Sequence, residues 1–148
     1  MKQRLTGTVY ASIEVGRNTV TNKDAMSCGY WGRILNVDLS TRTVAEEEVD
    51  GQVLRSMIGG AGLGTYYLQR DMDGSIGPLD PGNRLIFATG PFQATALPGS
   101  AKWTVSARSP LSNFYGEAAA GADWGINLKK TGYDAIVISG SSEKPVYL

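Results

Sequence analysis

The residues of this chain that could do chemistry lie mainly between Ala96 and Gly125. Six of the seven residues from Gly116 to Ala122 are glycine or alanine, and the exception is Glu117. Small side chains let main-chain N–H and C=O groups approach a ligand closely, so this run predicts a binding surface for a flat, bulky ligand. Close packing of a strand against a helix would also explain the run. Glu117, its one carboxylate, would serve proton transfer only if it were buried.

Histidine is absent from the chain, and Cys28 is its single cysteine. The chain therefore cannot assemble a Ser-His-Asp or Cys-His nucleophile, a His-rich zinc site or a four-cysteine iron–sulfur site. We interpret Cys28 as an incidental thiol, because no second cysteine and no histidine accompany it. The sequence thus predicts no catalytic residue and no metal ligand here, and any redox or metal chemistry must rely on groups outside this chain.

Two other runs invite a chemical interpretation: the acidic Glu46–Glu48 and the glycine-rich Gly59–Gly64. We interpret the glutamates as a solvated strand edge rather than an acid/base pair, because charged edges guard against aggregation. A glycine-rich loop before a helix can bind phosphate, but Thr65 stands where the third glycine of G-x-G-x-x-G would fall, and the P-loop lysine is missing. The glycines therefore predict a helix kink or a close contact between helix and sheet.

Composition narrows the classes of protein to which the chain can belong. Its 148 residues predict one domain, and 14 basic residues balance 14 acidic ones, which argues against a nucleic-acid partner. No apolar run reaches the roughly 18 residues of a membrane span, and the N-terminal region lacks the apolar core of a secretory signal. A lone cysteine is compatible with a reducing compartment, so we expect a cytoplasmic location.

Periodicity predicts the elements that must position these residues. Alternating apolar residues over Tyr30–Val49 predict a hairpin with its turn near Ser40–Arg42, and Asp50 is a typical N-cap for the helix that follows. The later elements are expected to be a helical piece over Thr65–Met72, a long turn over Asp73–Asn83, strands over Arg84–Gly90 and Lys102–Ser109, a helix over Gly121–Lys130, a strand over Tyr133–Gly140 and another that begins at Pro145.

The strand over Lys102–Ser109 alternates apolar and polar residues, so we expect it to be half-buried with its apolar side inward. Trp103 and Trp124 are interpreted as core or interface residues rather than as stacking partners of a cofactor. Residues 1–28 differ in composition from the rest and are expected to form a mobile N-terminal extension, while residues 29–148 form the domain. Because the last expected strand stops with the chain, we expect the domain to be truncated.

Five collinear segments carry a resemblance to a known family. They are GYWGRILNVDLST (Gly29–Thr41), RSMIGGAGLGTYYL (Arg55–Leu68), PLDPGNRLIFATGPF (Pro78–Phe92), ALPGSAKWTVSARSPL (Ala96–Leu111) and GYDAIVISGSSEKPVYL (Gly132–Leu148). In order and spacing they resemble the N-terminal domain of the tungsten-containing aldehyde:ferredoxin oxidoreductases. The resemblance implies an α+β fold, a β-rich domain of two intertwined repeats with short packing helices, in which the second repeat is incomplete.

The resemblance also implies a cofactor. In the family this domain is the base for a tungsten or molybdenum bis-pterin, while the ligands of a 4Fe-4S cluster lie in later domains and are absent from this chain. At the cofactor-contacting positions, Lys102 corresponds to an arginine, and Ala119, Ala120 and Gly121 correspond to an Asn-Ser-Gly stretch. Lysine keeps the positive charge of the arginine but lacks its planar guanidinium, which can form two parallel hydrogen bonds. The alanines could contact the cofactor only through their main-chain groups. A solvated lysine at a strand edge is the alternative for Lys102.

The function implied by the resemblance is the oxidation of aldehydes to carboxylic acids, with electrons passed through an iron–sulfur cluster to ferredoxin. Its partners would be the remaining domains or a second subunit, and ferredoxin, and the protein could form a homo-oligomer. We expect the 148 residues alone to be inactive. The alternative is a non-catalytic binding or assembly module that pairs with another chain through an edge strand.

Overall fold

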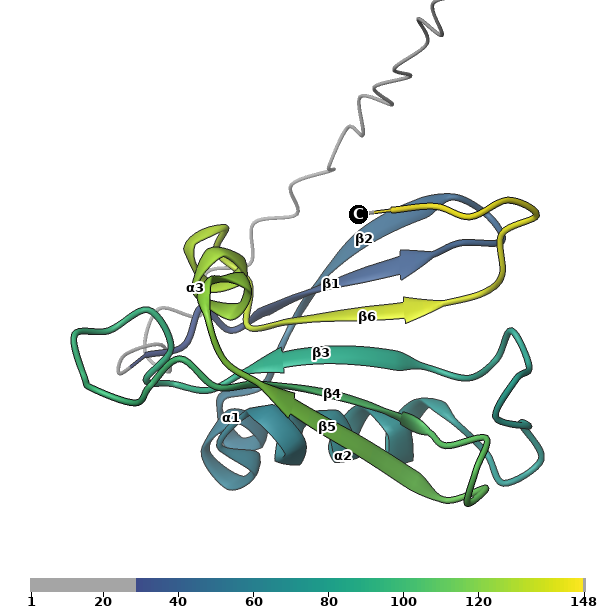
Figure 1. The fold of residues 1–148 in the computed structure, drawn as a ribbon, viewed down its shortest axis with the longest axis horizontal. Coiled ribbons are helices and arrows are strands. Elements are labelled where there is room, and N and C mark those ends of the chain that lie inside the picture. Colours follow the sequence, from purple (N-terminus) through teal and green to yellow (C-terminus); the bar gives the residue numbers. More distant parts are fainter. Residues whose placement is uncertain (1–28, 148) are drawn as a thin grey trace, which may run out of the picture.

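The computed structural model describes residues 29–147 as a six-stranded mixed sheet with three short helices (Figure 1). The elements follow in the order β1 (Arg33–Asp38), β2 (Thr43–Glu48), α1 (Gly51–Met57), α2 (Gly60–Asp71), β3 (Leu85–Thr89), β4 (Trp103–Arg108), β5 (Tyr115–Ala120), α3 (Asp123–Lys130) and β6 (Ala135–Ser139). The sheet is open, with strand order β2-β1-β6-β3-β4-β5. The predicted α+β fold is confirmed. The expected extension over residues 1–28 lies outside the described residues.

The hairpin and the first helix form where the sequence predicts them. Strands β1 and β2 pair antiparallel, with Val37 opposite Val44. Asp50 then begins α1, because its carboxylate accepts a hydrogen bond of 2.7 Å from the main-chain N–H of Gln52. On its other side β1 pairs in parallel with β6, which joins the first described strand to the last. This pairing places β6 in the middle of the sheet, between β1 and β3.

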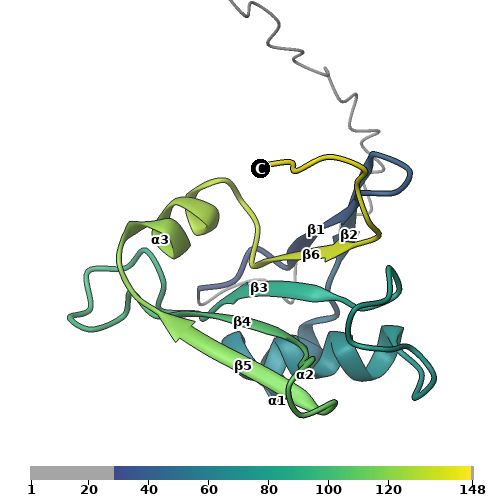
Figure 2. The ribbon, with the colours of Figure 1, turned by 45° about the vertical axis from the view of Figure 1, so that its right-hand side comes forward.

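The core lies between the sheet and helices α1 and α2, which cover one face (Figure 2). Its members come from both helices, from three of the strands and from the turn before α1: Ile34, Val49, Leu54, Leu63, Tyr67, Ile86, Ala88, Ala135 and Val137. Full burial of one large apolar side chain stabilises a fold by about 1.5–3 kcal/mol. This layer therefore supplies most of the apolar burial that holds the described residues together.

Helix α2 begins at Gly60, so most of the glycine-rich run lies inside the helix. The prediction that this run ends one helix and precedes a second piece at Thr65 is wrong on that point. The predicted close contact between helix and sheet is confirmed, because a Cβ on Gly64 would lie 2.4 Å from Ser106 Oγ. Close approach outweighs the low helix propensity of glycine at this position.

Strand β4 turns its polar side toward the helices, which corrects the prediction of an apolar side inward. Ser106 is fully buried opposite Gly64, and Thr104 lies beside the first turn of α2. Trp103 and Val105 are half-buried on the opposite face of the sheet. Because α2 approaches β4 so closely, only small side chains fit between them. The alternation predicted the strand but not which of its sides is buried.

The second face of the sheet is apolar and largely uncovered. Strand alternation places on it the half-buried side chains of Leu35, Phe87, Val105, Ile136 and Ile138. Among the described elements, α3 is the helix on this side, and it lies at one end of the sheet (Figures 1 and 2). Large exposed apolar patches mark surfaces that contact another part of a protein or another chain.

The end of the described chain differs from expectation at one place. Helix α3 and strand β6 form close to their predicted bounds, but residues 145–147, part of the strand expected to begin at Pro145, form no strand. The outer strands of the sheet are instead β2 and β5. Within residues 29–147, no helix has the length and apolar character required to cross a membrane.

Candidate functional site

The sheet brings the expected cofactor-binding residues together at one end of β4 and β5. Ala119 and Ala120 of β5 pair with Thr104 and Trp103 of β4, and Lys102 directly precedes β4. The indole N–H of Trp103 donates a hydrogen bond of 3.0 Å to the carbonyl oxygen of Gly121. Lys102 thus shares one corner of the sheet with Ala119–Gly121, which lie 17 to 19 positions later in the chain.

This corner is open to a ligand. Lys102, Ala119, Ala120 and Gly121 are all exposed, and a Cβ placed on Gly121 would meet only the Ala101 carbonyl oxygen, at 4.0 Å. Strand β5 is an outer strand, so half of its N–H and C=O groups point away from β4. The small-residue run therefore offers main-chain groups on an exposed edge, and it is not packed beneath a helix.

Gln93 fixes the main chain at Lys102, a role that its sequence context did not indicate. Its side chain is 3% exposed. With the amide oriented to suit its neighbours, it donates hydrogen bonds to the carbonyl oxygens of Lys102 (2.6 Å) and Ser100 (3.0 Å) and accepts one from Ile126 N–H (3.2 Å). One amide thus joins the loop before β4 to the first half of α3. A single glutamine in a turn-rich loop has no pattern that would have revealed it.

An aromatic cluster supports the same corner from the uncovered face. The rings of Trp103 and Trp124 have centroids 4.5 Å apart, and Phe87 stacks on Trp103 with its centroid 6.0 Å away. Gly125 permits this contact, because a Cβ there would lie 2.8 Å from the Trp103 ring. Trp103 is half-buried and Trp124 is 41% exposed, so neither belongs to the core between sheet and helices, and their interpretation as interface residues stays a prediction.

Ala122 connects the site to α3 in an unusual backbone conformation. Its φ is 63° and its ψ is −163°, a region of backbone space that is essentially restricted to glycine. It is the N-cap of α3 and provides no side-chain hydrogen bond to the helix. Backbone strain of this kind costs on the order of 1–3 kcal/mol and clusters at ligand-binding sites. Here it directly follows Gly121, at the exposed corner.

A buried ion pair anchors the other end of α3. Lys129 donates a hydrogen bond to Asp134, and the same carboxylate accepts bonds from the main-chain N–H groups of Trp31 (2.9 Å) and Gly32 (2.7 Å). The carbonyl oxygen of Asp134 also accepts a bond of 2.8 Å from the Thr89 hydroxyl. Helix α3 is therefore held at both ends, by Gln93 at the site and by this pair away from it.

Two further side chains complete the chemistry of the corner. The hydroxyl of Thr104 is buried and has no hydrogen-bond partner within the described residues, and it lies on the face it shares with Ala119. Glu117 is exposed and accepts a hydrogen bond of 3.0 Å from the Tyr115 hydroxyl. It is therefore not buried in the way that a role in proton transfer required.

Comparison with known proteins gives the family. The family model described as "Aldehyde ferredoxin oxidoreductase, N-terminal domain" matches residues 34–148. The tungsten-containing aldehyde ferredoxin oxidoreductases of Pyrococcus furiosus and Thermococcus kodakarensis are each 42% identical over 120 residues, which is 81% of this chain and 20% of each relative. The WOR-like subunit of an aliphatic sulfonate oxidoreductase from Pyrococcus furiosus is 38% identical over 122 residues, 80% of this chain and 19% of that relative.

A solved structure has the same fold. The active-site complex BamBC of benzoyl coenzyme A reductase, solved with 1,5-dienoyl-CoA, superposes with a TM-score of 0.80 at 31% sequence identity, over 83% of this chain and 19% of that one. The chain spans about a fifth of the length of the curated relatives it matches. It belongs to the aldehyde ferredoxin oxidoreductase family and corresponds to the N-terminal domain of those longer enzymes.

Proposed function

We propose that this chain is the cofactor base of a tungsten or molybdenum bis-pterin oxidoreductase that oxidises aldehydes to carboxylic acids in the cytoplasm. The observation that carries the proposal is the meeting of Lys102 with the exposed main chain of Ala119–Gly121 at one corner of the sheet. Tungsten-containing oxidoreductases among the relatives support the metal.

The residues present fit a flat, anionic cofactor. The Lys102 ammonium can meet a phosphate or a polar ring edge as a point charge. The open space at Gly121 and the outward N–H and C=O groups of β5 can bind the same kind of edge. The unpartnered Thr104 hydroxyl gives the corner a buried polar atom that its described neighbours do not satisfy. Ala119 and Ala120 can contribute main-chain contacts only.

In this arrangement the residues of this chain hold the cofactor in position and take no part in the reaction themselves. When bound, the metallopterin would supply the two-electron oxidation chemistry, and an iron–sulfur cluster held by other domains would pass the electrons to ferredoxin. Lys102 would balance the negative charge of the cofactor, and α3 with its aromatic cluster would keep the corner rigid. We therefore expect no turnover from the 148 residues alone.

Metal and pterin analysis of protein isolated from its own host tests the proposal. Bound tungsten or molybdenum with pterin is expected, and Lys102→Ala is expected to lower the metal content several-fold while Lys102→Arg retains it. Lys144→Ala, which removes an exposed lysine elsewhere, is the matched control. Isolation without metallopterin, or equal metal content in Lys102→Ala and the control, would contradict the proposal. So would viologen-coupled aldehyde oxidation by the 148 residues alone.

One observation supports the alternative of a binding or assembly module. Strand β5 is an outer strand with four small residues, so it could pair with a strand of another chain. Isolation of a tight dimer that lacks metallopterin would favour this function. Metallopterin in a monomer would favour the first one.

A further inference from the structure

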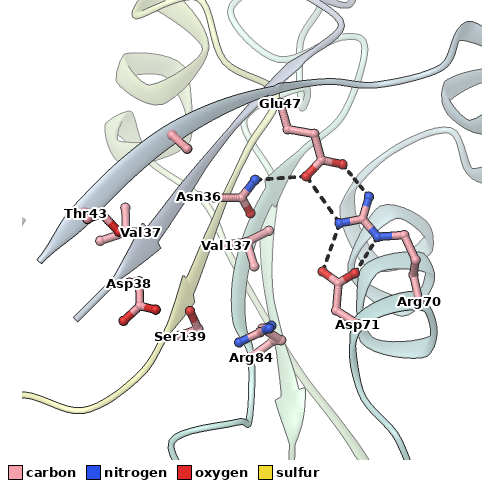
Figure 3. A pocket seen from close by; sticks show the side chains of 11 residues that line it. Asn36, Val37, Asp38, Thr43, Glu47, Arg70, Asp71, Arg84, Val137 and Ser139 are labelled. Atoms are coloured by element: carbon pink, nitrogen blue, oxygen red, sulfur yellow. Dashed lines mark hydrogen bonds and ion pairs between the residues drawn. The ribbon is translucent and has the colours of Figure 1, made fainter. Parts of the chain in front are cut away.

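A polar cavity, drawn in Figure 3, lies near the start of β3, whereas the proposed cofactor corner lies near its end. Its volume is about 360 Å³. Its polar lining comes from β1, β2, the end of α2, the residue before β3 and the end of β6: Asn36, Asp38, Thr43, Glu47, Arg70, Asp71, Arg84 and Ser139. That volume lies within the usual range of small-molecule sites, about 300–1,000 Å³.

The cavity exists because the helix-facing side of β1 changes from apolar to polar. Ile34 is fully buried in the core, whereas Asn36 and Asp38, on the same side of the strand, line the cavity. Helix α2 ends at Asp71, so no apolar side chain of that helix covers this part of the sheet. Polar groups that face inward need hydrogen-bond partners, and here some have them and others do not.

One wall of the cavity is a satisfied network of charges. Arg70 donates to both carboxylates beside it, with its Nη2 3.0 Å from Asp71 Oδ2 and 3.2 Å from Glu47 Oε2. The amide of Asn36 donates a further bond of 2.9 Å to Glu47. One guanidinium faces two carboxylates, which leaves this wall with a net negative charge. Glu47 belongs to the acidic run Glu46–Glu48, which we interpret from the sequence as a solvated strand edge. Strand β2 is an outer strand, as that interpretation requires, but the side chain of Glu47 is half-buried.

The remaining groups are available to a ligand. Asp38 uses Oδ1 to accept from the N–H groups of Ser40 (2.8 Å) and Thr41 (3.1 Å), which leaves Oδ2 without a donor among residues 29–147. Hydrogen bonds from this turn, chiefly the one from Thr41, hold the pKa of Asp38 below its usual value, so it is charged at neutral pH. The Arg84 guanidinium has no hydrogen bond or ion pair with any described side chain. In Figure 3, Arg84 lies between two groups of side chains. Asp38 and Ser139 are on one side of it, and the Glu47–Arg70–Asp71 network is on the other.

We propose that this cavity binds a small zwitterion that carries an ammonium group and a carboxylate on one short chain. A guanidinium with free donors matches a carboxylate in bidentate geometry, which assigns that end of the ligand to Arg84. An ammonium has three donors and no acceptor, and it matches the free oxygen of Asp38 together with the oxygens of Ser139 and Asn36. A ligand with one charge would leave one of these groups unpaired.

Three probes of matched length test the charge pattern on the unaltered full chain. Titrations followed by calorimetry or NMR use γ-aminobutyrate, butyrate and butylamine. Binding of γ-aminobutyrate is expected with a Kd on the order of 1 mM and at least about tenfold more tightly than either singly charged probe. Equal affinity for the three probes, or no binding of γ-aminobutyrate up to about 100 mM, would overturn the proposal. This comparison needs no variant and so does not depend on the folding of one.

Substitutions then assign the two ends of the ligand. Arg84→Gln is expected to lower the affinity for γ-aminobutyrate to that of butylamine, and Asp38→Asn to that of butyrate. Asparagine keeps an oxygen to accept the turn hydrogen bonds of Ser40 and Thr41. Arg55→Gln removes an exposed arginine of α1 and is the control that should bind as the unaltered chain does. The same loss in Arg84→Gln and Arg55→Gln would overturn the assignment. The cofactor corner is untouched by these variants, so metal content distinguishes a failure here from a failure of the proposed function.

Discussion

Lys129 and Asp134 form an ion pair whose side chains are only 5% and 1% exposed. The ammonium also lies 5.4 Å from the centre of the Tyr30 ring. Through the bonds that Trp31 and Gly32 donate to the carboxylate, the pair fastens the end of α3 and the start of β6 to the segment before β1. It therefore holds together parts of the chain that are about a hundred residues apart.

Removal of Lys129 should strongly destabilise the fold. Lys129→Met leaves the buried Asp134 carboxylate without its counter-charge, and breaking such a pair costs about 3–5 kcal/mol. Urea unfolding should show a lower midpoint with little change in slope. Lys130→Met changes the exposed neighbour and should remain within about 0.5 kcal/mol of the unaltered chain. Equal midpoints for the two variants would show that the ion pair contributes nothing to stability.

Gly64→Ala should also destabilise the fold, but by crowding. The added Cβ would lie 2.4 Å from the Oγ and 2.8 Å from the Cβ of Ser106, and overpacking of this kind costs about 1–3 kcal/mol. Gly74→Ala is the matched control, because nothing lies within 4 Å of its added Cβ. Thermal unfolding should show a lower midpoint for the first variant and an unchanged or higher one for the second. In a Ser106→Gly background the cost of Gly64→Ala should fall, and an unchanged cost would contradict the contact.

The order of strands and helices could be predicted from the sequence because it depends on local signals. The Asp50 cap, the alternation in β1, and Pro91 and Pro110, which follow β3 and β4 at a distance of two residues, each act locally. The buried side of β4 could not be predicted, because Ser106 is buried only where the glycines of α2 approach it. That contact joins residues far apart in the chain, and alternation alone favoured the apolar side.

The candidate site could be proposed from the sequence only in part. Lys102 and Ala119–Gly121 come from the family resemblance; the sheet register brings them to one corner, while their role in binding a cofactor stays a prediction. Gln93 was missed because its role depends on the approach of α3 to the loop before β4. The zwitterion cavity was missed because Arg84 and Asp38 meet only through the pairing of β1, β6 and β3. No local sequence pattern encodes these contacts between residues that are far apart in the chain.

Gln93→Leu should weaken both stability and the cofactor corner. The substitution leaves the carbonyl oxygens of Lys102 and Ser100 and the N–H of Ile126 without their partner, and a buried unsatisfied group costs about 1–3 kcal/mol. Denaturant unfolding measures the loss, with the exposed Gln52→Leu as control. In protein isolated from its host, metal content should fall as well, because Lys102 is no longer held. Unfolding curves that coincide with those of the control would remove Gln93 from this role.

The Glu47–Arg70 pair should make stability depend on pH in the acid range. Burial alone would raise the pKa of Glu47, but hydrogen bonds from Arg70 and Asn36 outweigh it and hold the pKa below the usual 4.5. A carboxyl group whose pKa is lowered by folding stabilises the folded state above its unfolded pKa, and this contribution disappears as the pH falls through the folded value. The difference in unfolding free energy between the unaltered chain and Glu47→Gln should therefore be largest near neutral pH and should shrink below 4.5. Denaturant unfolding across that range measures it, with the exposed neighbour Glu48→Gln as control. Arg70→Met should weaken the same pH dependence, because the hydrogen bonds of its guanidinium are the largest of the contacts that lower the pKa of Glu47.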